Sequence, residues 1–215
     1  MYKTPPRKGP EGGPAQFSPV IVSDSPVKKI AQQGNLTGNP RVVRDLAADT
    51  YNSIQKWNEQ QIIGAHIVKN IVTLKTNALV EGEAEKDRMY PEGLQQQCDL
   101  LEETYNMMCE AEATLRIITQ QLEAVVKLEK LQNICSPAAP MFITWPTQKF
   151  GEVLARISEA YRQELEVKRC VKENIAHCTS KESAVLHASA WVHQPYITTD
   201  VDLAVESLIV ETGHR

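Results

Sequence analysis

The chain has 215 residues, of which 42% are hydrophobic, 23% charged and 6% aromatic, a composition typical of a globular protein with one or two domains. Residues 1–40 hold five basic and two acidic residues, a charge of +3, so the net charge of −4 leaves −7 for the rest. An acidic body and short apolar runs argue against direct DNA binding and against a membrane-spanning segment. The five cysteines show no paired short spacing, and no secretion signal opens the chain, so we expect a reduced cytosolic or nuclear protein.

The first forty residues contain seven of the twelve prolines and five of the ten glycines, which predicts a disordered tail. Thr4 and Ser25 each precede a proline and have a basic residue three positions further on, the pattern that cyclin-dependent kinases accept. Ser18, followed by Pro19, is a minimal version of it. Proline keeps the peptide extended, and the base can meet an acidic subsite on the kinase. We predict phosphorylation at one or more of these sites, although proline-rich tails also produce such tetrapeptides by chance.

Apolar residues at a spacing of three and four predict a first helix from about residue 40 to residue 79. Its stripe consists of Leu46, Thr50, Ile54, Trp57, Gln61, Gly64, Val68 and Ile71. A second helix, from about 91 to 135, repeats a large apolar residue every seven positions, at Leu94, Leu101, Met108, Leu115 and Leu122. A heptad stripe of this length pairs with another helix. We therefore predict an antiparallel helical hairpin over residues 41–135, with pairing to a partner protein as the alternative.

Residues 141–215 are expected to form a C-terminal helical module, because the prolines between 136 and 140 stop the second helix. A third helix is predicted from about 147 to 178, with Glu164 and Lys168 as a favourable i,i+4 ion pair. Two pairs with capping-box spacing open a fourth and a fifth helix, namely Thr179 with Glu182 and Thr199 with Asp202. Gly213 ends the last helix. No segment shows a convincing period of two, so the predicted fold class is all-α.

No glycine-rich loop followed by a lysine is present to hold a phosphate, which argues against a kinase or an ATPase. Cysteines and histidines gather between residues 170 and 193, but there is no Cys-x-x-Cys pair, and the neighbouring His177 and Cys178 point about 100° apart on a helix. We expect no metal and no other cofactor, and no enzymatic activity. The alternative is an enzyme that uses Cys170 or Cys178 as nucleophile with His177 as base, although no third orienting group can be identified.

Large aromatic residues are concentrated in the C-terminal third. Trp145, Trp191 and Tyr196 can form the core of a small module, or part of the set can be a docking surface, since Trp, Tyr and Arg dominate interface hot spots. Arg162 and Arg169 lie seven residues apart on the third helix and can present two charged groups on one side. The predicted partner-docking residues are Trp145, Arg162, Arg169, Trp191, His193, Tyr196, His214 and Arg215.

At these residues the sequence resembles the cyclin-dependent kinase 2-interacting protein family. The resemblance is densest over residues 142–215 and consists of blocks in order: Thr144-Trp145-Pro146-Thr147 followed by Phe150, Tyr161-Arg162 with Glu164-Leu165 and Lys168-Arg169, Trp191 with His193-Gln194-Pro195-Tyr196, and Leu208 with Glu211-Thr212-Gly213-His214-Arg215. The N-terminal half resembles the family more loosely, through the Thr-Pro and basic elements of the tail, Trp57 and the paired long helices.

This resemblance implies a non-catalytic nuclear adaptor that binds a cyclin-dependent kinase with its cyclin and the kinase that fires replication origins, with roles in the cell cycle, DNA repair and checkpoint kinase signalling. It also implies membership of a chromatin-associated assembly built around a pair of AAA ATPases, which supports replication-fork progression and ribosome maturation. The residues themselves leave a second alternative, a structural coiled-coil subunit whose stripe from Leu94 to Leu122 homodimerises.

Overall fold

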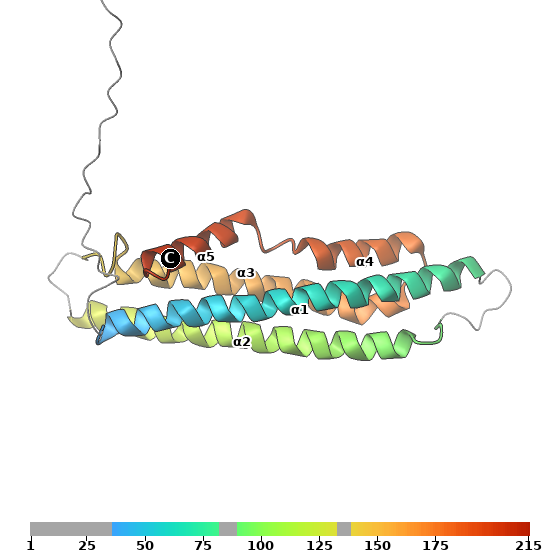
Figure 1. Ribbon diagram of the computed structural model, residues 1–215, viewed down its shortest axis with the longest axis horizontal. Helices are drawn as coiled ribbons and strands as arrows, with labels where there is room; N and C mark the ends of the chain where they lie inside the picture. The colour runs from blue at the N-terminus through green and yellow to red at the C-terminus, as the bar shows by residue number, and fades with distance from the viewer. Residues whose placement is uncertain (1–35, 82–89, 133–138) are drawn as a thin grey trace, which may run out of the picture.

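The computed structural model describes residues 36–81, 90–132 and 139–215 of the chain. This part is helical and contains no strand. Its elements are α1 (Asn39–Glu81), α2 (Leu94–Gln132), α3 (Thr147–Asn174), the 3-10 turn η4 (Ile175–His177), α4 (Lys181–His193) and α5 (Thr199–Glu211). Figure 1 shows α1, α2 and α3 side by side, with α4 and α5 following one another along one side of this bundle. The predicted all-α fold is confirmed.

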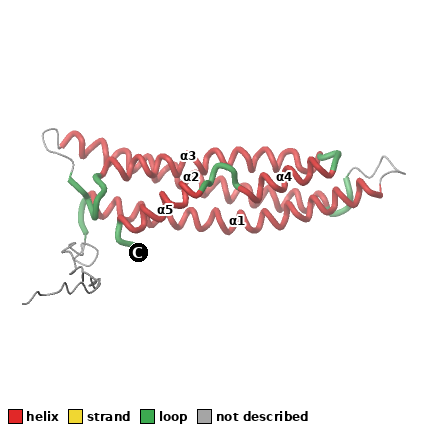
Figure 2. Tube along the Cα trace, turned by 90° about the horizontal axis from the view of Figure 1, so that it is seen from above, coloured by secondary structure: helices red, strands yellow, loops and turns green. Residues whose placement is uncertain are grey.

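The first two helices form the predicted antiparallel hairpin (Figures 1 and 2). All eight residues of the α1 stripe are buried, and so are the five heptad positions of α2. Burial of such stripes supplies most of the stability of a helix in a protein, since propensity alone is marginal in water. The stripe of α2 therefore pairs within the chain. α2 begins a few residues later than predicted, because Gly93 has φ +83°, outside the right-handed helical region.

The third helix begins at Thr147, directly after Pro146, as predicted. Its α-helical part ends at Asn174, and one 3-10 turn continues to His177, so the helix is slightly shorter than the predicted one. α3 packs against α2 and against the last two helices. Its buried side contains Glu164 and Lys168, two charged residues among aliphatic and aromatic ones, and this composition shapes the site described below.

We call α4, the connection 194–198 and α5 together the strap. Both predicted helix starts in the strap were wrong by one residue. The N-cap of α4 is Ser180, whose Oγ accepts a hydrogen bond from the Ser183 N–H at 3.2 Å, rather than Thr179. The N-cap of α5 is Thr198 rather than Thr199, and it makes no side-chain capping bond. Two adjacent hydroxyl residues offer the same capping group in two registers, and spacing alone cannot choose between them.

The C-terminal end of α5 follows the prediction. Gly213 has φ +71°, the left-handed conformation that commonly follows a helix and that glycine adopts without strain. The N–H groups of Gly213 and His214 donate to the carbonyl oxygens of Val210 and Ile209, at 3.0 Å each. The last carbonyl groups of the helix are therefore satisfied within the chain.

The strap packs on α1 and α3, so the hairpin and the C-terminal helices share one hydrophobic core. Trp57 of α1 and Tyr161 of α3 meet edge to face in its centre, with ring centroids 5.1 Å apart. The division into a unit 41–135 and a unit 141–215 stays a prediction. Among the described residues, no helix is both long enough and apolar enough to cross a bilayer. The tail sites Thr4, Ser18 and Ser25 lie outside the described residues.

Candidate protein-interaction surface

The strap breaks where Pro195 follows the last turn of α4, and this break leaves one backbone carbonyl without its helical partner. Proline has no N–H, so the carbonyl oxygen of Trp191 cannot accept the usual bond from residue 195. The side chains of Gln61 in α1 and Lys168 in α3 donate to it instead, Gln61 Nε2 at 2.7 Å. The C-terminal end of α4 is thereby bonded to two other helices, and the lysine also suits the negative end of the helix dipole.

Two further hydrogen bonds hold the residues just after α4. Trp57 Nε1 donates to Gln194 Oε1 at 2.9 Å, and the N–H of Tyr196 donates to Glu164 Oε2 at 3.0 Å. Gln194 has φ +44°, a left-handed conformation that is uncommon for a residue with a side chain. The bonds on both sides of it keep the chain in this conformation. We call the following residues the buried polar cluster: Trp57, Gln61, Glu164, Lys168, Trp191 and Gln194.

The predicted ion pair between Glu164 and Lys168 is part of this cluster, with 3.1 Å between Oε1 and Nζ, and both side chains are fully buried. Loss of water lowers the pKa of Lys168 to about 8 and raises the pKa of Glu164, while the attraction between the two groups opposes both shifts. Lys168 Nζ also lies 4.9 Å from the centroid of the Trp191 ring, in cation–π contact. Removing one partner of such a pair is strongly destabilising, because it leaves a buried charge uncompensated.

Gly64 allows the strap to lie close to α1. A Cβ atom at this position would be 2.3 Å from Cζ2 of Trp191 and 2.7 Å from Cε2, distances that nonbonded carbon atoms do not adopt. Gln61 and Gly64 are a polar and a very small residue in the largely apolar stripe of α1. Their roles are now clear, because Gln61 bonds the Trp191 carbonyl and Gly64 makes room for the Trp191 ring.

The C-terminal end of the strap is held by Glu211, which is buried. Its carboxylate accepts hydrogen bonds from the N–H groups of Thr144 and Trp145, the latter at 2.6 Å, and from the Thr144 hydroxyl at 3.1 Å. Three residues further on, His214 Nε2 donates to the carbonyl oxygen of Arg44 at 3.0 Å. The sequence blocks around Thr144 and Glu211 therefore meet at the C-terminal end of the strap, and those around Glu164 and Trp191 meet at its break. Both contacts fasten the strap to the bundle.

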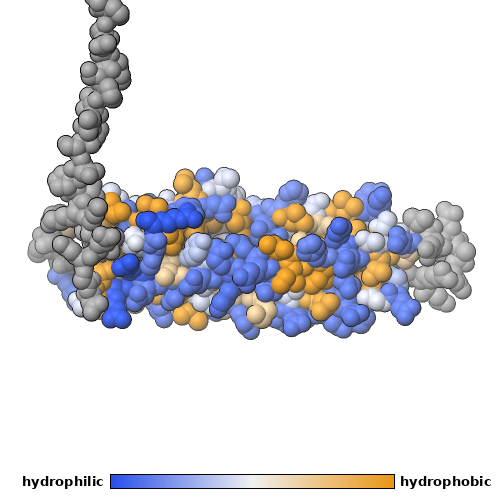
Figure 3. Space-filling model, viewed as in Figure 1, coloured by the Kyte–Doolittle hydropathy of each residue, from blue (hydrophilic) through white to orange (hydrophobic). Residues whose placement is uncertain are grey.

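The outward side of the strap contains exposed apolar side chains beside acidic ones. Its exposed large apolar residues are Val185, Leu186, Val192, Tyr196, Leu203 and Val210, and we call these six the outer face. Figure 3 shows apolar patches over both α4 and α5. The buried residues of α4 are only Ala184 and Trp191, whereas its other large apolar residues are exposed. Apolar residues therefore occur on both the inner and the outward side of this helix. Exposed apolar patches mark sites of contact between proteins, so the outer face is a candidate docking surface.

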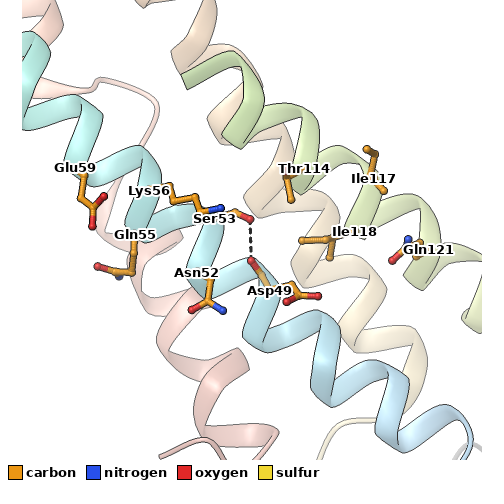
Figure 4. A pocket seen from close by; sticks show the side chains of 10 residues that line it. All are labelled: Asp49, Asn52, Ser53, Gln55, Lys56, Glu59, Thr114, Ile117, Ile118 and Gln121. Atoms are coloured by element: carbon orange, nitrogen blue, oxygen red, sulfur yellow. Dashed lines mark hydrogen bonds between the residues drawn. The ribbon is translucent and has the colours of Figure 1, made fainter. Parts of the chain in front are cut away.

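A groove of about 600 Å³ between α1 and α2 is a second candidate surface (Figure 4). α1 lines it with polar and charged side chains, among them Asp49 and Lys56, whereas α2 contributes Ile117 and Ile118 together with the polar Thr114 and Gln121. A small-molecule site is usually an enclosed apolar pocket with a few convergent polar groups. This groove is open and mixed, so it offers less apolar contact than the outer face does.

The chain is similar to known proteins over most of its length. The human cyclin-dependent kinase 2-interacting protein is 35% identical to it over 198 residues, which cover 84% of this chain and 92% of the human protein. The mouse protein of the same name is 32% identical over 202 residues, with the same coverage. The Xenopus laevis protein of that name is 29% identical over 203 residues, covering 90% of this chain and 98% of the relative. This chain belongs to the cyclin-dependent kinase 2-interacting protein family. No family model matches it.

The family resemblance read from residues 142–215 is thus confirmed, but the predicted docking residues do not form one surface. Arg162 and Arg169 are about half exposed and pair with Glu159, at 2.7 Å, and with Glu166 on their own helix. Arg162 also interacts electrostatically with Glu112 of α2. Arg169 interacts in the same way with Tyr105 of α2, so both arginines lie toward the α2 side of α3 and are not part of the outer face.

The aromatic and C-terminal residues divide between core and surface. Trp191 is fully buried, which agrees with the interpretation of its ring as core, and Trp145 is half-buried with its ring centroid 5.2 Å from that of Phe150. His193 and Tyr196 are exposed beside the break, and Arg215 is exposed and pairs with Glu206. A docking role for the exposed members stays a prediction.

The cysteine and histidine side chains pair differently from the enzyme hypothesis. Cys178 Sγ lies 3.5 Å from His187 Nδ1, whereas His177 Nδ1 lies 3.3 Å from the Tyr90 hydroxyl. His187 Nδ1 is also 2.8 Å from the Ser183 carbonyl oxygen, which can only accept, so this nitrogen carries the proton. Within residues 36–81, 90–132 and 139–215, no three His, Cys, Asp or Glu side chains are grouped so that they could hold a metal.

Proposed function

We propose that this chain is a non-catalytic adaptor that binds a cyclin-dependent kinase with its cyclin through the outer face of the strap. The observation that supports the partner is the 35% identity over 84% of the chain to a protein named for its interaction with cyclin-dependent kinase 2. The surface is supported by the six exposed apolar side chains of the outer face, because exposed apolar patches on soluble proteins mark sites of contact with other proteins.

The direct test uses purified full-length chain and purified cyclin-dependent kinase 2 with its cyclin, in a titration followed by calorimetry. The proposal predicts saturable binding with a dissociation constant of about 10 µM or tighter, the range of specific protein contacts. Absence of heat and of a co-migrating complex in gel filtration at 50 µM of each protein, concentrations that are about five times that constant, would remove the kinase as a direct partner.

The tail is part of the same proposal. Thr4 and Ser25 are substrates of the kinase, and Ser18 is a weaker one, because each precedes a proline and the first two also have the basic residue. Mass spectrometry after phosphorylation in vitro should find the label within residues 1–40. Label confined to other residues would contradict this part, while the binding experiment tests the adaptor role independently.

The family resemblance supports a more specific proposal. The chain is a nuclear protein that also contacts the origin-firing kinase, the checkpoint kinase machinery and an assembly built on a pair of AAA ATPases. In this role the chain supports DNA replication, repair and ribosome maturation without catalysis of its own. Affinity purification from nuclear extract tests it, with wild-type chain and a variant in which Leu186 and Leu203 are replaced by aspartate. Co-purification of the ATPases with wild-type chain but not with the variant supports this role, and their absence from both samples contradicts it.

A further inference from the structure

The part of the outer face on α5 combines exposed aliphatic and acidic side chains. Leu203 is 65% exposed and Val210 is 47% exposed, and the two lie seven residues apart, about 10.5 Å along a helix. Three exposed or half-exposed acidic residues lie beside them: Asp200, Asp202 and Glu206. Residues 181–211 as a whole contain five acidic residues and a single lysine. A ligand for this surface is therefore expected to be basic and aliphatic.

The chain itself contains a segment of that chemistry close to α5. Val27-Lys28-Lys29-Ile30 places two lysines between two aliphatic residues. Val27 and Ile30 are three residues apart, about 9.3 Å in an extended polyproline II chain, which is close to the separation of Leu203 and Val210. The charge of +3 on residues 1–40, against −7 on the rest of the chain, favours an encounter between the two.

The distance is within reach. The N-terminal end of α1 and the C-terminal end of α5 lie at the same end of the bundle (Figure 1), and the hydrogen bond from His214 to the Arg44 carbonyl joins them. Lys29 is ten residues before Asn39, the first residue of α1, so an extended chain places it up to about 33 Å away. α5 has 13 residues and is about 20 Å long, so the segment can reach all of it.

We propose that residues 27–30 bind the α5 part of the outer face within the same molecule, with Val27 and Ile30 on Leu203 and Val210 and with the two lysines facing the α5 carboxylates. Phosphorylation of Ser25 releases the segment, because a phosphate of charge −1.5 to −2 then stands two residues before Val27 and is repelled by Asp200, Asp202 and Glu206. This release rests on the proposed function, in which the kinase modifies Ser25. It makes the α5 part of the outer face available to a partner after phosphorylation, whereas the α4 part is open to a partner before it as well.

The experiment compares methyl NMR spectra of full-length chains. The variant Lys28→Glu with Lys29→Glu is expected to shift the Leu203 and Val210 methyl signals. The matched control Arg7→Glu with Lys8→Glu changes the tail charge by the same amount, but its residues lie more than twenty positions further from α1, and it should leave those signals in place. Equal shifts with both variants, or no shift with either, would overturn the proposal.

A zero-length carbodiimide cross-linker identifies the occupant. In wild-type chain, Lys28 or Lys29 should be linked to Asp200, Asp202 or Glu206, and Leu203→Ala should lower the yield at least fivefold. In a mixture of isotope-labelled and unlabelled chains, each cross-link should join two residues of the same chain. Links between a labelled and an unlabelled chain would show that a second copy is the occupant and would overturn the proposal. Phosphoserine incorporated at position 25 during synthesis should also lower the cross-linking yield fivefold. Because this experiment uses no kinase, it tests release of the segment even if the proposed kinase does not bind the chain.

Discussion

At the scale of single residues, Gly64 allows the Trp191 ring of the strap to lie close to α1. Replacing Gly64 by alanine improves helix propensity by about 1 kcal/mol, but the new Cβ would overlap a fully buried ring whose nearest atom is 2.3 Å away. We expect a net destabilisation of about 1 to 3 kcal/mol, as for other overpacked cores, measured by thermal or denaturant unfolding.

The matched control is Gly151→Ala in α3. Its Cβ would meet only Cγ2 of Val126, at 3.3 Å, and Val126 is half-buried and able to move slightly. This variant should be as stable as wild type or more stable. If the two substitutions changed the free energy of unfolding equally, Gly64 would not be needed for the approach of Trp191.

Lys168 gives a prediction for pH dependence. The ordinary pKa of 10.5 applies in the unfolded chain, whereas burial lowers the pKa to about 8 in the folded chain. Between pH 8 and 10 the unfolded state therefore binds more protons at this residue, and the contribution of Lys168 to stability increases with pH. Relative to Lys168→Met, the wild-type free energy of unfolding should rise by up to about 1.4 kcal/mol per pH unit in this window.

Denaturant unfolding at pH 7, 8, 9 and 10 measures this difference. Lys172→Met is the control, because it removes a neighbouring lysine whose ion pair with Glu102 is partly exposed, and it should keep the pH dependence of wild type. A difference between wild type and Lys168→Met that is flat with pH, or that falls, would contradict the described burial of the lysine.

At the scale of elements, the structure and the sequence-based prediction place the N-cap of α4 at different residues, and two substitutions distinguish them. Ser180→Ala removes the hydroxyl that accepts from the Ser183 N–H and should cost about 1 kcal/mol of stability. Thr179→Ala changes an exposed residue and should cost almost nothing. Unfolding measurements that gave the larger loss for Thr179 would restore the capping box predicted from spacing.

The helices themselves were predictable because their signals are local. Spacings of three, four and seven residues define the buried sides of α1 and α2, and a single glycine at 213 defines the end of α5. The buried polar cluster was not predictable, since Trp57 and Gln194 are 137 positions apart and no local pattern brings them together. The available signal was Gln61, Gly64 and Lys168 on otherwise apolar stripes, because a polar or very small residue there needs a partner on another helix.

At the scale of the whole molecule, the exposed arginines of α3 are not part of the outer face, so their role in docking is tested separately. Arg162→Ala with Arg169→Ala should weaken capture of the proposed kinase tenfold or more if these side chains are anchors. The melting temperature should change little, because exposed ion pairs contribute about 0 to 1 kcal/mol. The control removes two lysines from α2, Lys127→Ala with Lys130→Ala, and should not change capture. Unchanged affinity in the arginine variant would leave α3 a structural role only.

The central claim is that the outer face of the strap is the partner-binding surface. The most direct measurement is the affinity of full-length chain for the proposed kinase partner with Leu186→Asp and Leu203→Asp combined, alongside Leu128→Asp and Leu131→Asp as the control. All four leucines are between 55% and 70% exposed, so both variants should fold and melt like wild type. We predict at least a tenfold loss of affinity for the strap variant and no loss for the control. Equal affinity of the strap variant, the control and wild type would contradict the claim.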